Sequence, residues 1–406
     1  MITILKNGLS LSFIRIVTLL FPIVIVPILI SRIGMDKYGE VVFFTAIYSY
    51  FITVVSFGFE ESATQTLAKD HFYRLTRSEY VLSVIALKAI IAIIFIIIIL
   101  LLLFFGYCSH FFALFSITIV AEVLNPLWFY QGVEKIHIVS ISSIISKVLY
   151  GIAIFVFIKS PTDYYLIPVS IGVSGIISYI YPFFLIFNEC GFNREALKYK
   201  NLRFVFIDSY SIFLTNFIPT IKDKIGAILI GSSFAMSIVA IYDIIMKVLN
   251  LLFIPLNVMN SSFYPTLSRL RSRKTLIVLS LLSIIYASLS FFLFYFCLDF
   301  FVGCFFNSYL EYVSAIKIVS LSVVFYSGSL LIGKNILLVA GFYNYVLISI
   351  VLSTSFYLLS VFILHVFGML NIYSLCALTT MSFLFEMLVR ILFLKRSNAL
   401  SFFPLN

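Results

Sequence analysis

Residues 204–231 read FVFIDSYSIFLTNFIPTIKDKIGAILIG, a run with the length and apolarity of a helix that spans a lipid bilayer. Three consecutive charges, Lys222, Asp223 and Lys224, lie past the midpoint of this run. An ionised side chain at that depth costs about 2.5–3.5 kcal/mol on insertion scales, so a residue placed there is a candidate for function. The alternative is that the triplet neutralises itself, and the rest of the chain has to decide between the two.

The whole chain has the composition of a membrane protein. Its 406 residues are 62% hydrophobic and 11% charged, with a mean hydropathy of +1.15, which excludes a soluble domain. Roughly 20 apolar residues are needed to cross a hydrocarbon core of about 30 Å. About twelve runs reach this length: 9–30, 40–59, 80–105, 110–130, 138–158, 164–187, 205–231, 233–258, 276–302, 312–333, 343–367 and 370–394. The connections are too short to hold a catalytic domain, so we predict an all-α polytopic membrane protein.

The basic residues are divided unevenly between the two sides of the predicted membrane. With a cytoplasmic N-terminus, sixteen of the 27 Lys and Arg residues fall in connections on that side and three on the other. This positive-inside signal predicts that both termini are cytoplasmic. It also explains the net charge of +10 without nucleic acid as a partner. Because the first apolar run is long enough to span the membrane, we expect no cleavable signal.

No motif predicts an enzyme, a metal site or a cofactor. The chain contains no Walker A sequence, kinase motif or nucleophile elbow, so we do not expect ATP-driven transport by this chain alone. The four histidines show no ligand spacing, and the cysteines are scattered without a CxxC pair, which indicates apolar filling. These cysteines are Cys108, Cys190, Cys297, Cys304 and Cys376.

Two halves are visible when the chain is compared with itself at an offset of 200 residues. Ser62, Thr66 and Leu67 fall on Ser262, Thr266 and Leu267, each at a junction between helix and cytoplasm. Six helices per half give both halves the same direction, as in transporters built from parallel repeats. We therefore predict bundles at 1–200 and 201–406 around a central cleft that opens to alternate sides. The charged triplet falls over Pro22-Ile23-Val24, so its charges are an addition to one half.

Eight cations lie within the predicted spans. They are Arg15, Lys88, Lys147, Lys222, Lys224, Lys247, Lys317 and Arg390. Asp243 precedes Lys247 by four residues, and Glu386 precedes Arg390 by four, which favours ion pairs along one helix face over a binding role. Lys317 is near enough to a helix end to reach the headgroups.

The remaining cations have no acid three or four residues away along the helix. Arg15 and Lys88 lie within three turns of the cytoplasmic end, where either a snorkelling or a binding role is open. Lys147 is about ten residues from both ends of its span, so we expect it to face a cleft.

Helix geometry separates the members of the triplet. At 100° per residue, Lys222 and Lys224 point about 200° apart, and Asp223 bisects them. On the side of Asp223 the residues are small or polar: Ser209, Asn216, Pro219, Thr220, Gly226 and Ala227. Such a stripe is typical of a helix that faces a wet cavity or a close neighbour. Glu122 is a second carboxylate within a span, and we consider it the better candidate for proton coupling, because two lysines keep Asp223 ionised.

A family resemblance extends over nearly the whole chain, and one segment is its most specific part. It runs from Asn125 to Lys135 and resembles the N-P-x-W-x-x-Q-G-x-E-K segment of Wzx-type O-antigen and polysaccharide flippases, in the multidrug/oligosaccharidyl-lipid/polysaccharide exporter superfamily. The matching residues are Asn125, Pro126, Trp128, Gln131, Gly132, Glu134 and Lys135. Departures are Glu60 where Asn is usual, Ala240 where Gly is usual and Ile136 where Met is usual.

The resemblance implies a transporter, not an enzyme, in the bacterial inner membrane. Its substrate would be an undecaprenyl-diphosphate-linked oligosaccharide, moved from the cytoplasmic to the periplasmic leaflet with coupling to an ion or proton gradient. Membrane lipids, and the polymerase and chain-length machinery of the same pathway, are the implied partners. A cationic patch is needed for the diphosphate, and the candidates are Arg15, Lys88, Lys147, Lys222, Lys224 and Lys247.

Two other classes remain open. A multidrug or cation exporter of similar fold is disfavoured by the cationic interior that the spans predict. A membrane O-antigen polymerase or glycosyltransferase is less favoured still, because such enzymes carry a large external loop and none is present. A major-facilitator carrier would have a Gly-Asp-Arg-rich loop between its second and third helices, which residues 60–79 lack.

Overall fold

The computed structural model describes residues 2–69, 75–191, 197–305 and 312–403, without the side chains of 2–20, 23, 69, 265, 270, 297 and 299–305. Helices make up almost all of this part of the chain, and no strand occurs in it. Eleven helical segments there are long and apolar enough to cross a membrane. The prediction of an all-α polytopic membrane protein is confirmed.

The first two predicted spans, 9–30 and 40–59, form one continuous element, α1 (Ile2–Ser56). Its axis bends at Gly34, whose φ of 80° is a backbone conformation that residues with a Cβ seldom adopt. This merger explains why eleven segments are found where about twelve runs were predicted. Each of the other ten runs overlaps one segment of the structure.

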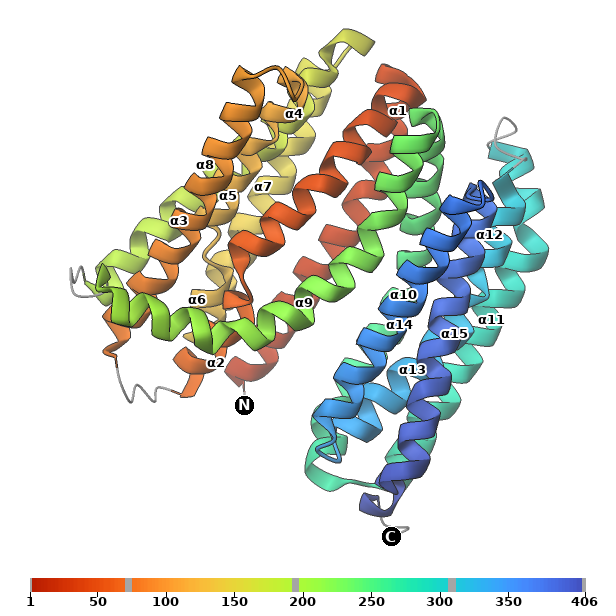
Figure 1. Cartoon of the computed structure of the whole chain (residues 1–406). Helices are drawn as coiled ribbons and strands as arrows, with labels where there is room; N and C mark the ends of the chain where they lie inside the picture. Colours follow the sequence, from red (N-terminus) through yellow and green to blue (C-terminus); the bar gives the residue numbers. More distant parts are fainter. Residues whose placement is uncertain (1, 70–74, 192–196, 306–311, 404–406) are drawn as a thin grey trace. The chain divides into compact units, whose positions relative to one another are not determined.

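The chain forms two compact units, residues 1–240 and 241–406, and the boundary lies inside α10 (Met236–Leu270). Within each unit, long helices pack side by side (Figure 1). Unit 1 contains α1, α2 (Phe59–Lys69), α3 (Arg77–Phe104), α4 (His110–Leu114), α5 (Ser116–Leu124), α6 (Leu127–Gly132), α7 (Ile136–Phe157), η1 (Pro161–Tyr165), α8 (Leu166–Cys190) and α9 (Tyr199–Ser233). Unit 2 continues from α10 through α11 (Arg273–Phe305), α12 (Val313–Ser320), α13 (Ser322–Leu330), η4 (Leu331–Leu338), α14 (Tyr343–Val366), α15 (Ile372–Ser397) and η5 (Ala399–Phe402). The division into bundles at 1–200 and 201–406 stays a prediction.

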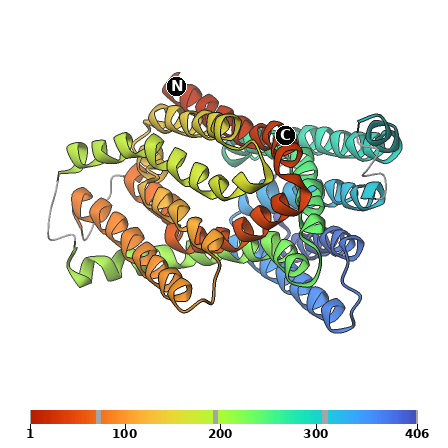
Figure 2. The same cartoon turned by 90° about the horizontal axis from the view of Figure 1, so that it is seen from above.

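Unit 1 is held together by close helix contacts and an aromatic core. The first arm of α1 runs beside α7 (Figure 2), and α9 packs along α1 and α3. The core includes Phe57, Trp128 and Phe129, each at most 5% exposed. A Cβ on Gly58 would lie 2.6 Å from the backbone nitrogen of Phe213, so only glycine allows α9 to approach this closely.

Unit 2 contains a helix that changes its winding within the predicted span 312–333. It passes from α12 through α13 into η4, a π-helical segment, and such segments often occur at functional sites. The guanidinium of Arg390, from α15, packs against Gly333 of η4, and a Cβ on that glycine would lie 2.6 Å from Nη1. A small residue is therefore required at position 333 to admit Arg390.

Candidate functional site

A polar cavity of about 420 Å³ lies in unit 1 among helices of membrane-spanning length. Four helices contribute its walls: α1, α2, α5 and α9. The lining residues are Ile52, Thr53, Ser56, Glu60, Glu61, Glu122, Thr215, Asn216, Pro219 and Thr220. Three carboxylates, an amide and several hydroxyls thus line an open cavity between helices that are otherwise largely apolar.

Glu122 is bound on two sides. Lys88 Nζ, from α3, lies 2.9 Å from its Oε1, and Asn125 Nδ2 donates to its Oε2 at 3.3 Å. The side chain of Lys88 is only 1% exposed, so this ion pair is buried. Lys88 is thereby occupied by the carboxylate in this conformation. Sequence spacing could not reveal the pair, because the partners are 34 residues apart on different helices.

Glu61 joins α2 to α9. Asn216 Nδ2 donates to Glu61 Oε2 at 2.8 Å. The hydroxyls of Thr215 and Thr220 donate to carbonyls of their own helix, so their oxygens can still accept from a ligand in the cavity. A role for Glu61 is not predicted from the sequence, and Glu60 is there only a departure from the family motif. The available signal was a pair of adjacent acids at the end of the apolar run 40–59.

Part of the predicted polar stripe on α9 faces the interior of unit 1, but Asp223, the residue at its centre, does not. Asn216, Pro219 and Thr220 line the cavity, while Ser209 is fully buried and shares a hydrogen bond of 2.7 Å with Ser62. Asp223 comes about one turn after Thr220 and is exposed. Lys222 and Lys224 are half-buried. Their binding role, and that of Asp223 in coupling, stay predictions.

Lys147 lies elsewhere in unit 1, in an apolar groove between α1 and α7 of about 500 Å³. It is half-buried, and its Nζ lies 5.8 Å from the centre of the Phe21 ring. The side chain of Arg15, also predicted to bind substrate, falls outside the described residues.

Both ion pairs predicted from spacing along one helix are confirmed in unit 2. Lys247 pairs with Asp243, and Arg390 Nη2 lies 2.7 Å from Glu386 Oε1. Lys247 is therefore held by an acid and not presented alone as a phosphate contact. Its place among the substrate-binding candidates stays untested.

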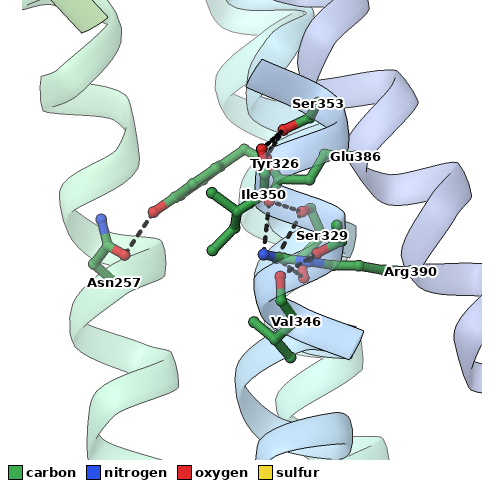
Figure 3. Close-up of polar contacts among 9 residues, drawn as sticks. Asn257, Tyr326, Ser329, Val346, Ile350, Ser353, Glu386 and Arg390 are labelled. Atoms are coloured by element: carbon green, nitrogen blue, oxygen red, sulfur yellow. Dashed lines mark hydrogen bonds and ion pairs between the residues drawn. The ribbon is translucent and has the colours of Figure 1, made fainter. Parts of the chain in front are cut away.

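The Glu386–Arg390 pair is the centre of a network that connects α13, α14 and α15 (Figure 3). Arg390 Nη1 donates to the carbonyl of Ser329 at 2.7 Å, and Nε donates to Ser349 Oγ at 3.0 Å. Glu386 accepts from the hydroxyls of Ser329 at 2.9 Å and Ser353 at 3.3 Å. Both charges are satisfied inside the unit, which supports an architectural role.

The motif segment Asn125–Lys135 mainly provides contacts between helices α6 and α2. Trp128 is 2% exposed, and its carbonyl accepts from Thr64 Oγ1 of α2 at 3.0 Å. A Cβ on Gly132 would lie 2.6 Å from Leu67 Cβ, so this glycine lets α6 approach α2. Pro126 precedes α6, Gln131 is half-buried, and Glu134 turns the chain with a φ of 60°. Lys135 pairs with Glu189 at 2.7 Å, both partly exposed.

The sequence matches the family described as "Polysaccharide biosynthesis protein" over residues 4–271. That is about two-thirds of the chain. The chain belongs to this family. The resemblance carried by the Asn125–Lys135 segment is thus confirmed at family level.

Two relatives have related names. A putative O-antigen transporter of Escherichia coli (strain K12) is 22% identical over 274 residues, which cover 65% of this chain and 64% of that protein. A putative O-antigen transporter of Shigella dysenteriae is 25% identical over 179 residues, 43% of this chain and 45% of that protein. The similarity therefore extends over less than two-thirds of either relative's length.

Among solved structures, an inward-facing MATE-family multidrug resistance transporter of the MOP superfamily matches with a TM-score of 0.69. It is 12% identical and covers 92% of this chain and 93% of its own. The MATE multidrug transporter DinF-BH, solved in complex with a ligand, matches with a TM-score of 0.68 at 13% identity, covering 99% and 97%. At such low identity these likenesses show that the family member shares the MATE fold.

Proposed function

We propose that this chain moves a lipid-linked oligosaccharide across the bacterial cytoplasmic membrane by alternating access, without covalent chemistry. The lipid is an undecaprenyl diphosphate that carries an O-antigen or related repeat unit, and the movement is from the cytoplasmic to the periplasmic leaflet. Family membership, the names of the two relatives and the MATE fold all favour a transporter. Both termini are assigned to the cytoplasm, as the distribution of basic residues predicts.

The observation that carries the proposal is the oxygen-lined cavity of unit 1. Sugar hydroxyls both donate and accept hydrogen bonds, whereas ionised carboxylates only accept them. Glu60 and Glu61 are therefore suited to accept hydrogen bonds from sugar hydroxyls. Asn216 supplies both an amide donor and an acceptor. A volume of about 420 Å³ is within the range of ordinary small-molecule sites.

The diphosphate requires a different location, because carboxylates repel an anion. No cation is among the described residues that line the cavity, and Lys88 is paired with Glu122 behind it. Lys147, Lys222 and Lys224 are therefore the candidates for phosphate contact among the side chains described. Glu122 is the candidate for coupling, since its protonation would release Lys88 from the ion pair.

The test is deletion of the gene in its host, followed by complementation and analysis of lipid-linked oligosaccharides on each leaflet. We expect deletion to trap the repeat unit on the cytoplasmic leaflet, and Glu61→Gln or Asn216→Ala to restore export poorly. Glu189→Gln is the matched control, because this carboxylate also belongs to an interhelical polar contact but lies away from the cavity. Normal export by the cavity variants would contradict the assignment of the sugar site. Single-repeat O-antigen on the surface of the deletion strain would indicate a polymerase instead.

The same carboxylates favour one second function, export of an organic cation. The cationic interior predicted from the spans disfavours such an exporter, but the described lining of this cavity contains three acids and no base. Efflux of ethidium, a fluorescent organic cation, from cells that express the wild type separates the two functions. Efflux that depends on Glu61 while lipid-linked oligosaccharide stays unmoved would favour the exporter.

A further inference from the structure

The apolar groove of unit 1 lies along the seam between α1 and α7. Phe21 and Val24 form one wall, and Val148, Ile152 and Phe155 form the other. Val24 is 62% exposed and Val148 53% exposed, so the groove is open at these two positions. Arg32 fixes the seam at the end of α7 by donating from Nη1 to the carbonyls of Ile154 and Ile158, both at 2.8 Å. The groove thus presents an apolar surface that fits a hydrocarbon chain.

Among the described side chains that line this groove, Lys147 is the one polar residue. It forms no hydrogen bond or ion pair with any residue that the structure describes, in contrast to Lys88, Lys247 and Arg390. Its Nζ lies 5.8 Å from the centre of the Phe21 ring. A cation among hydrocarbon without a counter-ion is costly, and in membrane proteins such a residue generally serves a ligand. The charge complementarity of the groove therefore favours a chain with an anionic group.

The depth of Lys147 decides which anionic chain fits. Lys147 follows the start of α7 at Ile136 by 11 residues (147 − 136) and precedes its end at Phe157 by 10 (157 − 147). At a rise of about 1.5 Å per residue, each end of the helix is roughly 15 Å away, close to half the thickness of a hydrocarbon core. A resting phospholipid keeps its phosphate at the interface. Only a lipid whose phosphate is crossing the membrane would bring that group to Lys147.

We propose that the α1–α7 groove holds the hydrocarbon chain of the translocated lipid, an isoprenoid diphosphate, and that Lys147 pairs with its diphosphate at mid-membrane. The inference rests on the proposed function for the identity of the crossing lipid. It divides the substrate between two places in unit 1: the oxygen-lined cavity binds sugar, and this groove binds chain and diphosphate. The ammonium of Lys147 is a point charge without a fixed bidentate geometry. It can therefore stay paired with a diphosphate that changes its position during translocation.

The experiment measures binding of farnesyl diphosphate to the purified full-length protein in nanodiscs of phosphatidylcholine. Farnesol supplies the chain without the charge, and inorganic diphosphate supplies the charge without the chain. We expect Lys147→Met to weaken farnesyl diphosphate binding ten- to a hundredfold, with little effect on farnesol, and Lys147→Arg to retain binding. Gly151→Leu should weaken both prenyl ligands, because position 151 lies in the groove 3.6 Å from the Phe21 ring. Lys317→Met, which removes another span cation in unit 2, is the matched control.

Equal affinity of wild type and Lys147→Met for farnesyl diphosphate would overturn the proposal. Displacement of farnesyl diphosphate by an equal concentration of phosphatidylglycerol would also overturn it, since the groove would then be an ordinary phospholipid site. Thermal melts of every variant, together with the retained binding of Lys147→Arg, exclude misfolding as the cause of a loss. If the lysine dependence holds but no oligosaccharide lipid is moved in cells, the proposed function fails, and the groove stands as a prenyl diphosphate site without a translocated lipid.

Discussion

The Glu386–Arg390 network allows a sharp test of what a buried ion pair contributes to unit 2. In Arg390→Met the carboxylate of Glu386 keeps two serine hydroxyls but loses its counter-ion, in a place where the two side chains are 12% and 8% exposed. Removing one partner of a buried pair costs about 3–5 kcal/mol, because the other charge is left uncompensated. Replacing both partners by neutral side chains is often near neutral. We therefore expect Arg390→Met to be strongly destabilising and Glu386→Gln/Arg390→Met to recover most of the loss.

The chain provides a separate reporter for each unit. Cys376 on α15 is fully buried, so alkylation of this thiol, resolved by mass spectrometry of its peptide, reports the opening of unit 2. Trp128, the single tryptophan, lies in the core of unit 1 and reports that unit by fluorescence. Denaturant titrations of the purified protein then give a midpoint for each unit. Arg390→Met should lower the Cys376 midpoint, and the double variant should raise it again.

Lys247→Met is the matched control for this prediction. The Asp243–Lys247 pair has the same spacing, but its side chains are 20% and 33% exposed, so breaking it should shift the midpoint less. The reasoning is refuted if Arg390→Met and wild type expose Cys376 at the same denaturant concentration. A double variant no more stable than Arg390→Met would also contradict it, because the penalty would not then come from the Glu386 carboxylate that has lost Arg390.

Three further predictions concern unit 1. Gly132→Ala should destabilise the protein by about 1–3 kcal/mol, since its Cβ would lie 2.6 Å from Leu67 Cβ, and thermal melts monitored by Trp fluorescence measure this. Glu122→Gln should abolish the dependence of transport on an imposed proton gradient while leaving substrate binding intact, as measured in proteoliposomes. Lys147→Ala and Lys222→Ala should each weaken assembly of surface O-antigen in a complemented deletion strain.

Controls for these predictions are available in the same unit. Gly151→Ala places a Cβ at an ordinary 3.6 Å from the Phe21 ring and should melt like the wild type. Unchanged gradient dependence in Glu122→Gln would remove that residue from coupling. Full complementation by the Lys147→Ala/Lys222→Ala double variant would exclude both lysines from diphosphate binding.

Features that depend on a single helix, such as the position of a span or an ion pair along one face, are predicted well from the sequence. Apolar runs locate the spans because a bilayer imposes their length, and the pairs Asp243–Lys247 and Glu386–Arg390 follow from the helical repeat alone. The stripe on α9 is predictable for the same reason. Only the bend at Gly34, which merges two runs into one helix, departs from the predicted count.

What the sequence could not predict depends on which helices meet. Lys88 pairs with Glu122 across 34 residues, and Asn216 meets Glu61 across 155, distances at which spacing rules carry no information. The cavity is acidic because α2 and α5 converge there, although the predicted spans together contain eight cations and seven acids. Composition describes a whole bundle, whereas a binding site depends on the few side chains that one junction brings together.

The segment that identified the family is used to join α6 to α2, with Trp128 buried and Gly132 against Leu67. None of its seven motif residues lines the oxygen-lined cavity. A search with this segment therefore groups chains by shared ancestry and says little about their cargo. Transporters that carry different sugars can keep the same contact between α6 and α2. A classification by cargo should instead compare the positions of Glu60, Glu61 and Asn216 from one homologue to the next.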